Sequence, residues 1–222
     1  PNIAPSLRRQ RLIISAYDRD ALTTASGLSP KFGYDFPRLS NHYFNTTFIH
    51  NEADVYYLAE LRKAGSPWTR PNDAPLDRGK VKMPDDRTFR GDNKWNFDND
   101  AEGGNRHHNR TTRYWLYLLG QPGNEAEFVY SLVNGDALHV REANESVNDE
   151  LTARSFPDGN SGQLMAVDDE WWFTDSWGQT PRNADWAHKN SDAAIRYHSE
   201  YALRSRENEY DFSALTEFFK TV

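Results

Sequence analysis

Three short clusters contain residue types that could bind a metal or attack a carbonyl. Asp98–Gly103 places oxygen ligands and a glycine as the start of an EF-hand calcium loop does, but its twelfth position is Asn109 instead of a bidentate glutamate. His107–His108 would point to opposite faces of a strand, and no third ligand follows at a useful spacing. Gly159–Gly162 resembles a nucleophile turn, although its setting is that of an ordinary hairpin turn. These clusters favour solvated loops and turns over a metal site or a serine nucleophile.

Four tryptophans follow within a short stretch: Trp171, Trp172, Trp177 and Trp186. Exposed tryptophans stack on sugars or nucleotides, whereas most tryptophans of a polar chain pack in its core. We favour the core interpretation.

The segment after these clusters carries a family resemblance. Trp172–Gly178, followed by an expected helix and then Tyr197–Tyr201, is similar to the catalytic end of pertussis-toxin-like mono-ADP-ribosyltransferases. Phe44–Thr47 resembles the Phe-x-Ser-Thr-Ser strand of that family, and Asp20–Lys31 resembles the helix and turn that follow its first strand. The three pieces occur in the family's order and cover about half of the chain.

The resemblance implies a role for specific residues. Glu200 would be the catalytic glutamate, with Thr46 or Thr47 orienting it and His198 facing the acceptor. The first-strand arginine that binds NAD would be Arg19, or Arg11 as second choice. Three further candidates would contact NAD or its nicotinamide: Tyr201, Trp177 and His42. Glu207–Glu209 offers a second register for the glutamate motif.

The implied reaction is transfer of ADP-ribose from NAD, its substrate, to a host protein. Cleavage of the nicotinamide–ribose bond develops oxocarbenium character, which a carboxylate such as that of Glu200 would stabilise in the transition state. An NAD glycohydrolase, in which water replaces the acceptor, remains an alternative. A chain of this family would be a secreted toxin or effector delivered into the host cytosol, with separate delivery or binding subunits.

Composition limits the other classes. The 222 residues carry 33 acidic and 26 basic side chains, a net charge of −7, so we expect no general nucleic-acid binding. No apolar run reaches the roughly 18 residues of a membrane-spanning helix, so we expect no membrane span. Aromatic residues make up 14% of the chain, enough for large rings to build a core in a polar sequence.

The elements that would position these residues follow from periodicity and turn signals. Strands are predicted for 12–17, 44–47, 113–119, 127–133, 137–141 and 170–173, with a tight hairpin at Asn134–Asp136. Helices are predicted for 21–26, 51–63, 187–197 and 212–219. Residues 66–110, rich in Pro, Gly, Asp and Asn, predict a long loop insertion with at most one short strand.

Together these elements predict one catalytic domain over residues 1–222, of the α+β class, with two packed antiparallel sheets and flanking helices. Two other classes stay open. A carbohydrate-binding β module would present exposed tryptophans to sugar rings, and a structural protein would form oligomers through a large apolar patch.

Overall fold

The computed structural model describes residues 9–24, 27–28, 35–36, 42–51, 53–64, 78–98, 108–158, 162–167, 188–197 and 201–221. Contacts divide the chain into two compact units, Pro1–Ser146 and Val147–Val222. We call them the barrel unit and the second unit.

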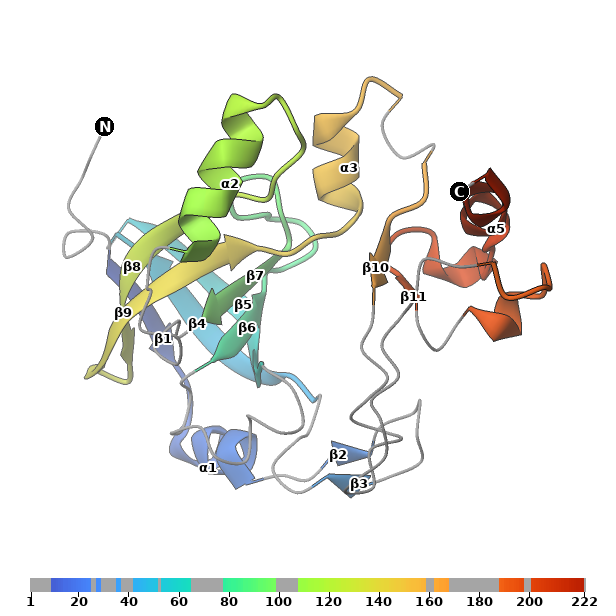
Figure 1. The fold of residues 1–222 in the computed structure, drawn as a ribbon. Helices are drawn as coiled ribbons and strands as arrows, with labels where there is room; N and C mark the ends of the chain where they lie inside the picture. The colour runs from blue at the N-terminus through green and yellow to red at the C-terminus, as the bar shows by residue number, and fades with distance from the viewer. Residues whose placement is uncertain are drawn as a thin grey trace. The chain divides into compact units, whose positions relative to one another are not determined.

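The barrel unit is a single sheet closed on itself (Figure 1). Its seven strands follow the order β1-β4-β5-β6-β7-β9-β8 around the barrel. All neighbours are antiparallel except β1 and β8, whose parallel pairing closes the ring. The strands are β1 (Arg9–Ile13), β4 (Phe44–His50), β5 (Asp54–Lys63), β6 (Gly79–Lys82), β7 (Lys94–Asp98), β8 (Ala126–Val133) and β9 (Asp136–Glu145).

This architecture corrects the predicted fold class. The expected α+β fold with two packed antiparallel sheets, typical of ADP-ribosyltransferases, is wrong, because one closed seven-stranded barrel takes the place of both sheets. The β1–β8 pair joins residues that are about half the chain apart, so no local sequence signal announces the closure.

Aromatic rings pack among aliphatic side chains in the barrel core. Phe48, Phe89 and Trp95 contact one another there, with ring centroids 5.3 Å apart for Phe48–Phe89 and 5.1 Å for Phe89–Trp95. Trp95 is 1% exposed, and its indole N–H donates to the Phe89 carbonyl at 3.0 Å. The interior is therefore a packed core in which each buried polar edge of a ring finds a partner.

The predicted hairpin at Asn134–Asp136 is confirmed. Asn134 and Gly135 have φ angles of 51° and 89°, the left-handed values that a two-residue hairpin turn between β8 and β9 requires. The predicted strands 44–47, 127–133 and 137–141 correspond to β4, β8 and β9. Asn-Gly between two apolar runs is a strong local signal, which explains this success.

The predicted helix 51–63 is wrong, since Asp54–Lys63 form β5. Its buried apolar positions are Tyr56, Ala59 and Leu61, a spacing that imitates a helix at its start. The cause is an irregular register between Thr46 and Phe48 of β4, opposite which β5 carries one extra residue.

The predicted strand 113–119 is also wrong, because α2 (His108–Leu118) covers this segment. Its aromatic residues suggested a half-buried strand, yet Tyr114, Trp115 and Tyr117 are at least 60% exposed. Figure 1 shows α2 lying beside β8 and β9, and the helix turns its arginine side towards them.

The first strand and helix are shifted from their predicted bounds. β1 ends at Ile13, and α1 (Ala16–Thr24) begins inside the segment 12–17 that was expected to be extended. Within 66–110, two barrel strands, β6 and β7, lie where at most one short strand was expected. Two short strands, β2 (Gly27–Leu28) and β3 (Asp35–Phe36), pair with each other.

The second unit has a small aromatic core of its own, made by Tyr197, Tyr201, Phe212 and Phe219. Its elements are α3 (Asp149–Ser155), β10 (Met165–Val167), η4 (Ala194–Arg196), β11 (Tyr201–Leu203), η5 (Glu207–Glu209) and α5 (Ser213–Thr221). α5 confirms the predicted helix 212–219.

The predicted helix 187–197 shrinks to the single turn η4, because Asn190 adopts a left-handed φ of 55° and the Ser191 hydroxyl accepts the N–H of Ala193. The predicted strand 170–173 lies outside the described residues. Within the part of the chain that the structure describes, every helix is too short or too polar to cross a membrane.

Candidate anion-binding groove

The residues implied by the family resemblance are divided between the two units. Thr46 and Thr47 lie on β4, Arg11 on β1 and Arg19 on α1, all within the barrel unit. Thr46 is buried, and its hydroxyl donates to the Ile13 carbonyl at 3.0 Å.

Tyr201 lies in the core of the second unit. It is 2% exposed and packs with Phe219, with the two ring centroids 5.5 Å apart. Glu200, His198 and Trp177 lie outside the described residues. The remaining candidate, His42, lies in the barrel unit at a different kind of site.

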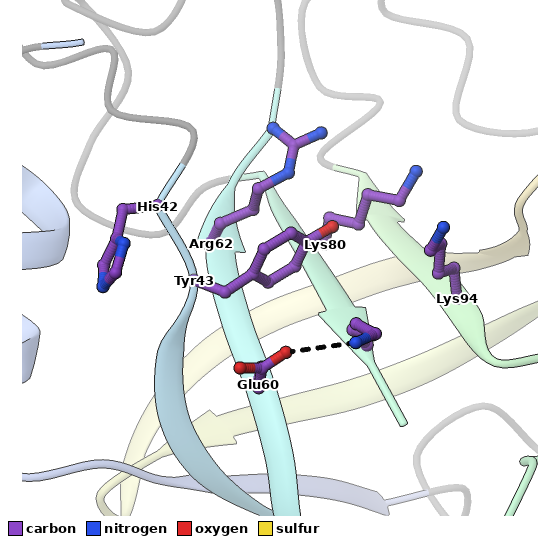
Figure 2. Close-up of a pocket in the computed structure, with 7 residues that line it drawn as sticks. His42, Tyr43, Glu60, Arg62, Lys80 and Lys94 are labelled. Carbon is purple, nitrogen blue, oxygen red and sulfur yellow. Dashed lines mark ion pairs between the residues drawn. The ribbon is translucent and has the colours of Figure 1, made fainter. Parts of the chain in front are cut away.

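That site is a groove of about 630 Å³ on the barrel surface (Figure 2). We call it the cationic groove and define it by its lining residues: His42, Tyr43, Glu60, Arg62, Lys80, Lys82 and Lys94. Four of these seven side chains carry a positive charge and one carries a negative charge.

Strand alternation places these side chains outside the barrel. Leu61, Val81 and Trp95 belong to the core, and successive residues of a strand point to opposite faces. The charged neighbours of these three residues therefore share the outer face of β5, β6 and β7: Glu60, Arg62, Lys80, Lys82 and Lys94.

The register sets like charges opposite each other. Arg62 pairs with Lys80 across β5 and β6, and Lys82 pairs with Lys94 across β6 and β7. Directly opposed like charges destabilise a sheet. An anion bound in the groove would offset this cost.

Local contacts hold one of the cations in place. Arg62 donates from Nη1 to the Lys63 carbonyl at 3.1 Å, and its guanidinium carbon lies 5.4 Å from the centroid of the Tyr43 ring. Stacking on an aromatic ring fixes the plane of a guanidinium, whose N–H groups are donors that suit oxyanions. Figure 2 shows the Tyr43 ring beside Arg62, whereas His42 points away from the other side chains.

The charge of Lys82 is shared. Its Nζ lies 3.6 Å from Glu60 Oε2 and 3.6 Å from Asp85 Oδ1. The groove can bind oxyanions through its cations, accept a hydrogen bond at Glu60 and stack a ring on Tyr43.

Sequence reasoning missed this site. The alternating runs Glu60-Leu61-Arg62 and Lys80-Val81-Lys82 are the available signal, since a strand with one buried face shows such a pattern. The sequence predicts a helix over 51–63 and a loop over 66–110, and these predictions do not place the charges of the two runs on one surface.

A second charged group involves two buried residues of the barrel strands, His50 on β4 and Glu127 on β8. Arg90 Nη2 is 3.0 Å from Glu127 Oε1 and 3.4 Å from His50 Nε2. His50 and Glu127 are buried, and the Arg90 guanidinium lies 5.1 Å from the centroid of the Phe89 ring. These contacts pair the buried carboxylate with a cation, which is the arrangement of a structural ion pair.

Among the described residues, no group of three or more His, Asp or Glu side chains is placed to hold a metal ion. No known family model matches the chain, and no curated protein sequence matches it.

Proposed function

We propose that the barrel unit binds a phosphate-bearing ligand in the cationic groove. The observation that carries the proposal is the gathering of four cations from three adjacent strands around one carboxylate, in a chain whose net charge is −7. An acidic protein repels anions at long range, so a local cluster of this kind favours a specific anion over general attraction to polyanions.

The residue types favour phosphate over a lone carboxylate. The Arg62 guanidinium offers a planar fork of donors, and Lys80 offers a compact ammonium opposite it. Two residues along β6, a step of about 6.6 Å, Lys82 and Lys94 provide a second cationic pair. Two cationic pairs at this spacing suit a ligand with more than one anionic oxygen group.

NAD belongs to this ligand class, because it carries two phosphates and aromatic rings. The transfer of ADP-ribose by Glu200 stays a separate hypothesis, and groove binding does not depend on it. Nicotinamide release from NAD by the intact chain, compared with Glu200→Gln, tests that hypothesis directly.

The groove itself is tested by calorimetric titration of inorganic tripolyphosphate into wild-type protein and Lys94→Gln. We expect the variant to bind about tenfold more weakly, since a lost charged contact is worth about 1.4 kcal/mol or more. The unliganded variant should melt no lower than wild type, because the substitution removes a like-charge pair with Lys82.

Arg9→Gln is the matched control. Arg9 is exposed on β1, which does not line the groove, and the substitution removes the same charge. Its affinity for tripolyphosphate should stay within about twofold of wild type. Equal weakening by both variants, or no binding by wild type at low salt, would contradict the proposal.

A further inference from the structure

Among the residues that the structure describes, Glu60 supplies the one negative charge that lines the cationic groove. It lies directly opposite Lys82 in the β5–β6 register and on the same strand face as Arg62, two residues away. A site that bound phosphate alone would bind it more tightly without this carboxylate, since like charges repel. Its presence therefore points to a part of the ligand that is not anionic.

An ionised carboxylate is a hydrogen-bond acceptor with about four lone-pair sites on its two oxygens. Lys82 Nζ lies 3.6 Å from Glu60 Oε2, and the Glu60 side chain is 37% exposed. Such a group accepts hydrogen bonds from ligand hydroxyls, whereas a fully ionised phosphate group has no O–H to donate. Glu60 thus selects for O–H donors next to the phosphate.

The positions of the other side chains set the orientation of such a ligand. Arg62 and Lys80 lie opposite each other in the β5–β6 register, and Glu60 and Lys82 lie opposite each other two residues along the strands. In the view of Figure 2 the Tyr43 ring lies between Arg62 and Glu60. A ring on this line would place its phosphate at Arg62 and its hydroxyls at Glu60, with one face against Tyr43.

We infer that the ligand is a phosphate ester of a polyhydroxylated ring, of the sugar-phosphate class, with Glu60 as its specificity-determining residue. This inference rests on the proposed function and names the ligand class of the same groove. Inorganic polyphosphates would bind through the cations alone and would gain nothing from Glu60.

The test is whether the substitution Glu60→Gln raises or lowers the affinity for each of two probes. Ribose 5-phosphate and inorganic tripolyphosphate are titrated into wild type and Glu60→Gln. We expect Glu60→Gln to bind tripolyphosphate a few-fold more tightly, because a repelling charge is gone. The same variant should bind ribose 5-phosphate about tenfold more weakly, because a charged hydrogen-bond acceptor becomes a neutral amide.

Asp85→Asn is the matched control. Asp85 contacts the same Lys82 nitrogen at the same 3.6 Å, but its side chain is 85% exposed and does not line the groove. We expect this variant to bind both probes slightly more tightly, as a change of charge alone would. Melting temperatures of all variants verify that the barrel is folded.

Each other outcome overturns a specific statement. If Glu60→Gln tightens both probes, or weakens both equally, Glu60 does not read hydroxyls and the inference fails. If wild type binds tripolyphosphate but not ribose 5-phosphate, the inference fails and the proposed function stands. If wild type binds neither probe, the proposed function itself fails.

Discussion

Arg113 shows how one residue joins α2 to the barrel. Its Nη1 donates to Glu142 Oε1 and Asn144 Oδ1, and its Nε donates to Asn124 Oδ1 at 2.9 Å. Glu142 and Asn144 are at most 4% exposed, on the outer face of β9 beneath the helix. The helix therefore packs through a charged contact, while its aromatic residues face away from the barrel.

We expect Arg113→Met to lower the free energy of unfolding by about 3 kcal/mol, because the buried Glu142 carboxylate loses its guanidinium partner. Urea denaturation of the two proteins measures the difference.

The comparison variant is Arg110→Met, one turn earlier on α2. The Arg110 guanidinium carbon lies 5.1 Å from the centroid of the Phe128 ring on β8. We expect a loss of about 1 kcal/mol or less for this variant. Equal losses for the two variants would show that the buried ion pair is not what anchors the helix.

At the scale of elements, the β8–β9 turn both ends a hairpin and closes the barrel. Asn134 Oδ1 accepts the Ile14 N–H, and Nδ2 donates to the Ile14 carbonyl, both at 2.9 Å. Asn134 also adopts a left-handed φ of 51°. Asn134 thus adopts the backbone angle that the turn requires, and its side chain links the end of β8 to the end of β1.

Two substitutions separate these roles. Asn134→Gly removes the two side-chain hydrogen bonds but tolerates the backbone angle, and we expect a loss of about 2 kcal/mol. Asn134→Ala also removes these hydrogen bonds but, unlike glycine, keeps a Cβ at positive φ, so we expect it to be about 1 kcal/mol less stable than Asn134→Gly. Thermal or urea unfolding measures both, and equal stability of the two variants would argue against backbone strain at this position.

The first turn of α5 predicts an acid-sensitive element in the second unit. The Ser213 backbone N–H donates to Asp211 Oδ1 at 2.9 Å and is the main cause that lowers the pKa of the Asp211 carboxyl, with the Ser213 hydroxyl and Gln163 adding to it. A lowered pKa in the folded state means that the stabilisation is present above about pH 4 and is lost as the pH falls through the folded pKa.

We therefore expect Asp211→Asn to be less stable than wild type at pH 7, with the gap closing as the pH falls below about 4. Melting curves across pH 2–7 would check this, and carboxyl chemical shifts would report the pKa itself. A gap that stays constant with pH would mean that the carboxylate charge has no part in the cap.

Sequence reasoning succeeded for elements with local signals and failed where distant pairing decides. Asn134-Gly135 identifies its hairpin, and the apolar spacing of 212–219 identifies α5. The bulge in β5 depends on the neighbouring β4, so its sequence alone suggests a helix. The groove could not be predicted either, because its cations come from three strands that only the barrel register aligns.

At the scale of the whole molecule, each unit has its own hydrophobic cluster. The barrel cluster runs from Leu12 to Ala143, and the other consists of aromatic residues from Tyr197 to Phe219. All seven residues of the cationic groove belong to Pro1–Ser146. A unit that has its own core and its own binding residues should fold and bind without the other.

We accordingly expect a fragment ending at Ser146 to unfold cooperatively and to bind tripolyphosphate within about threefold of the intact chain, a difference of about 0.7 kcal/mol. The reason is that β1 and β8 close the barrel within this fragment, so that no strand edge is opened by the truncation. Circular dichroism melting and calorimetry on both proteins make the comparison. A fragment that melts cooperatively but binds more than tenfold more weakly would show that the second unit contributes to binding. A fragment that does not melt cooperatively would show that the barrel depends on the second unit for folding.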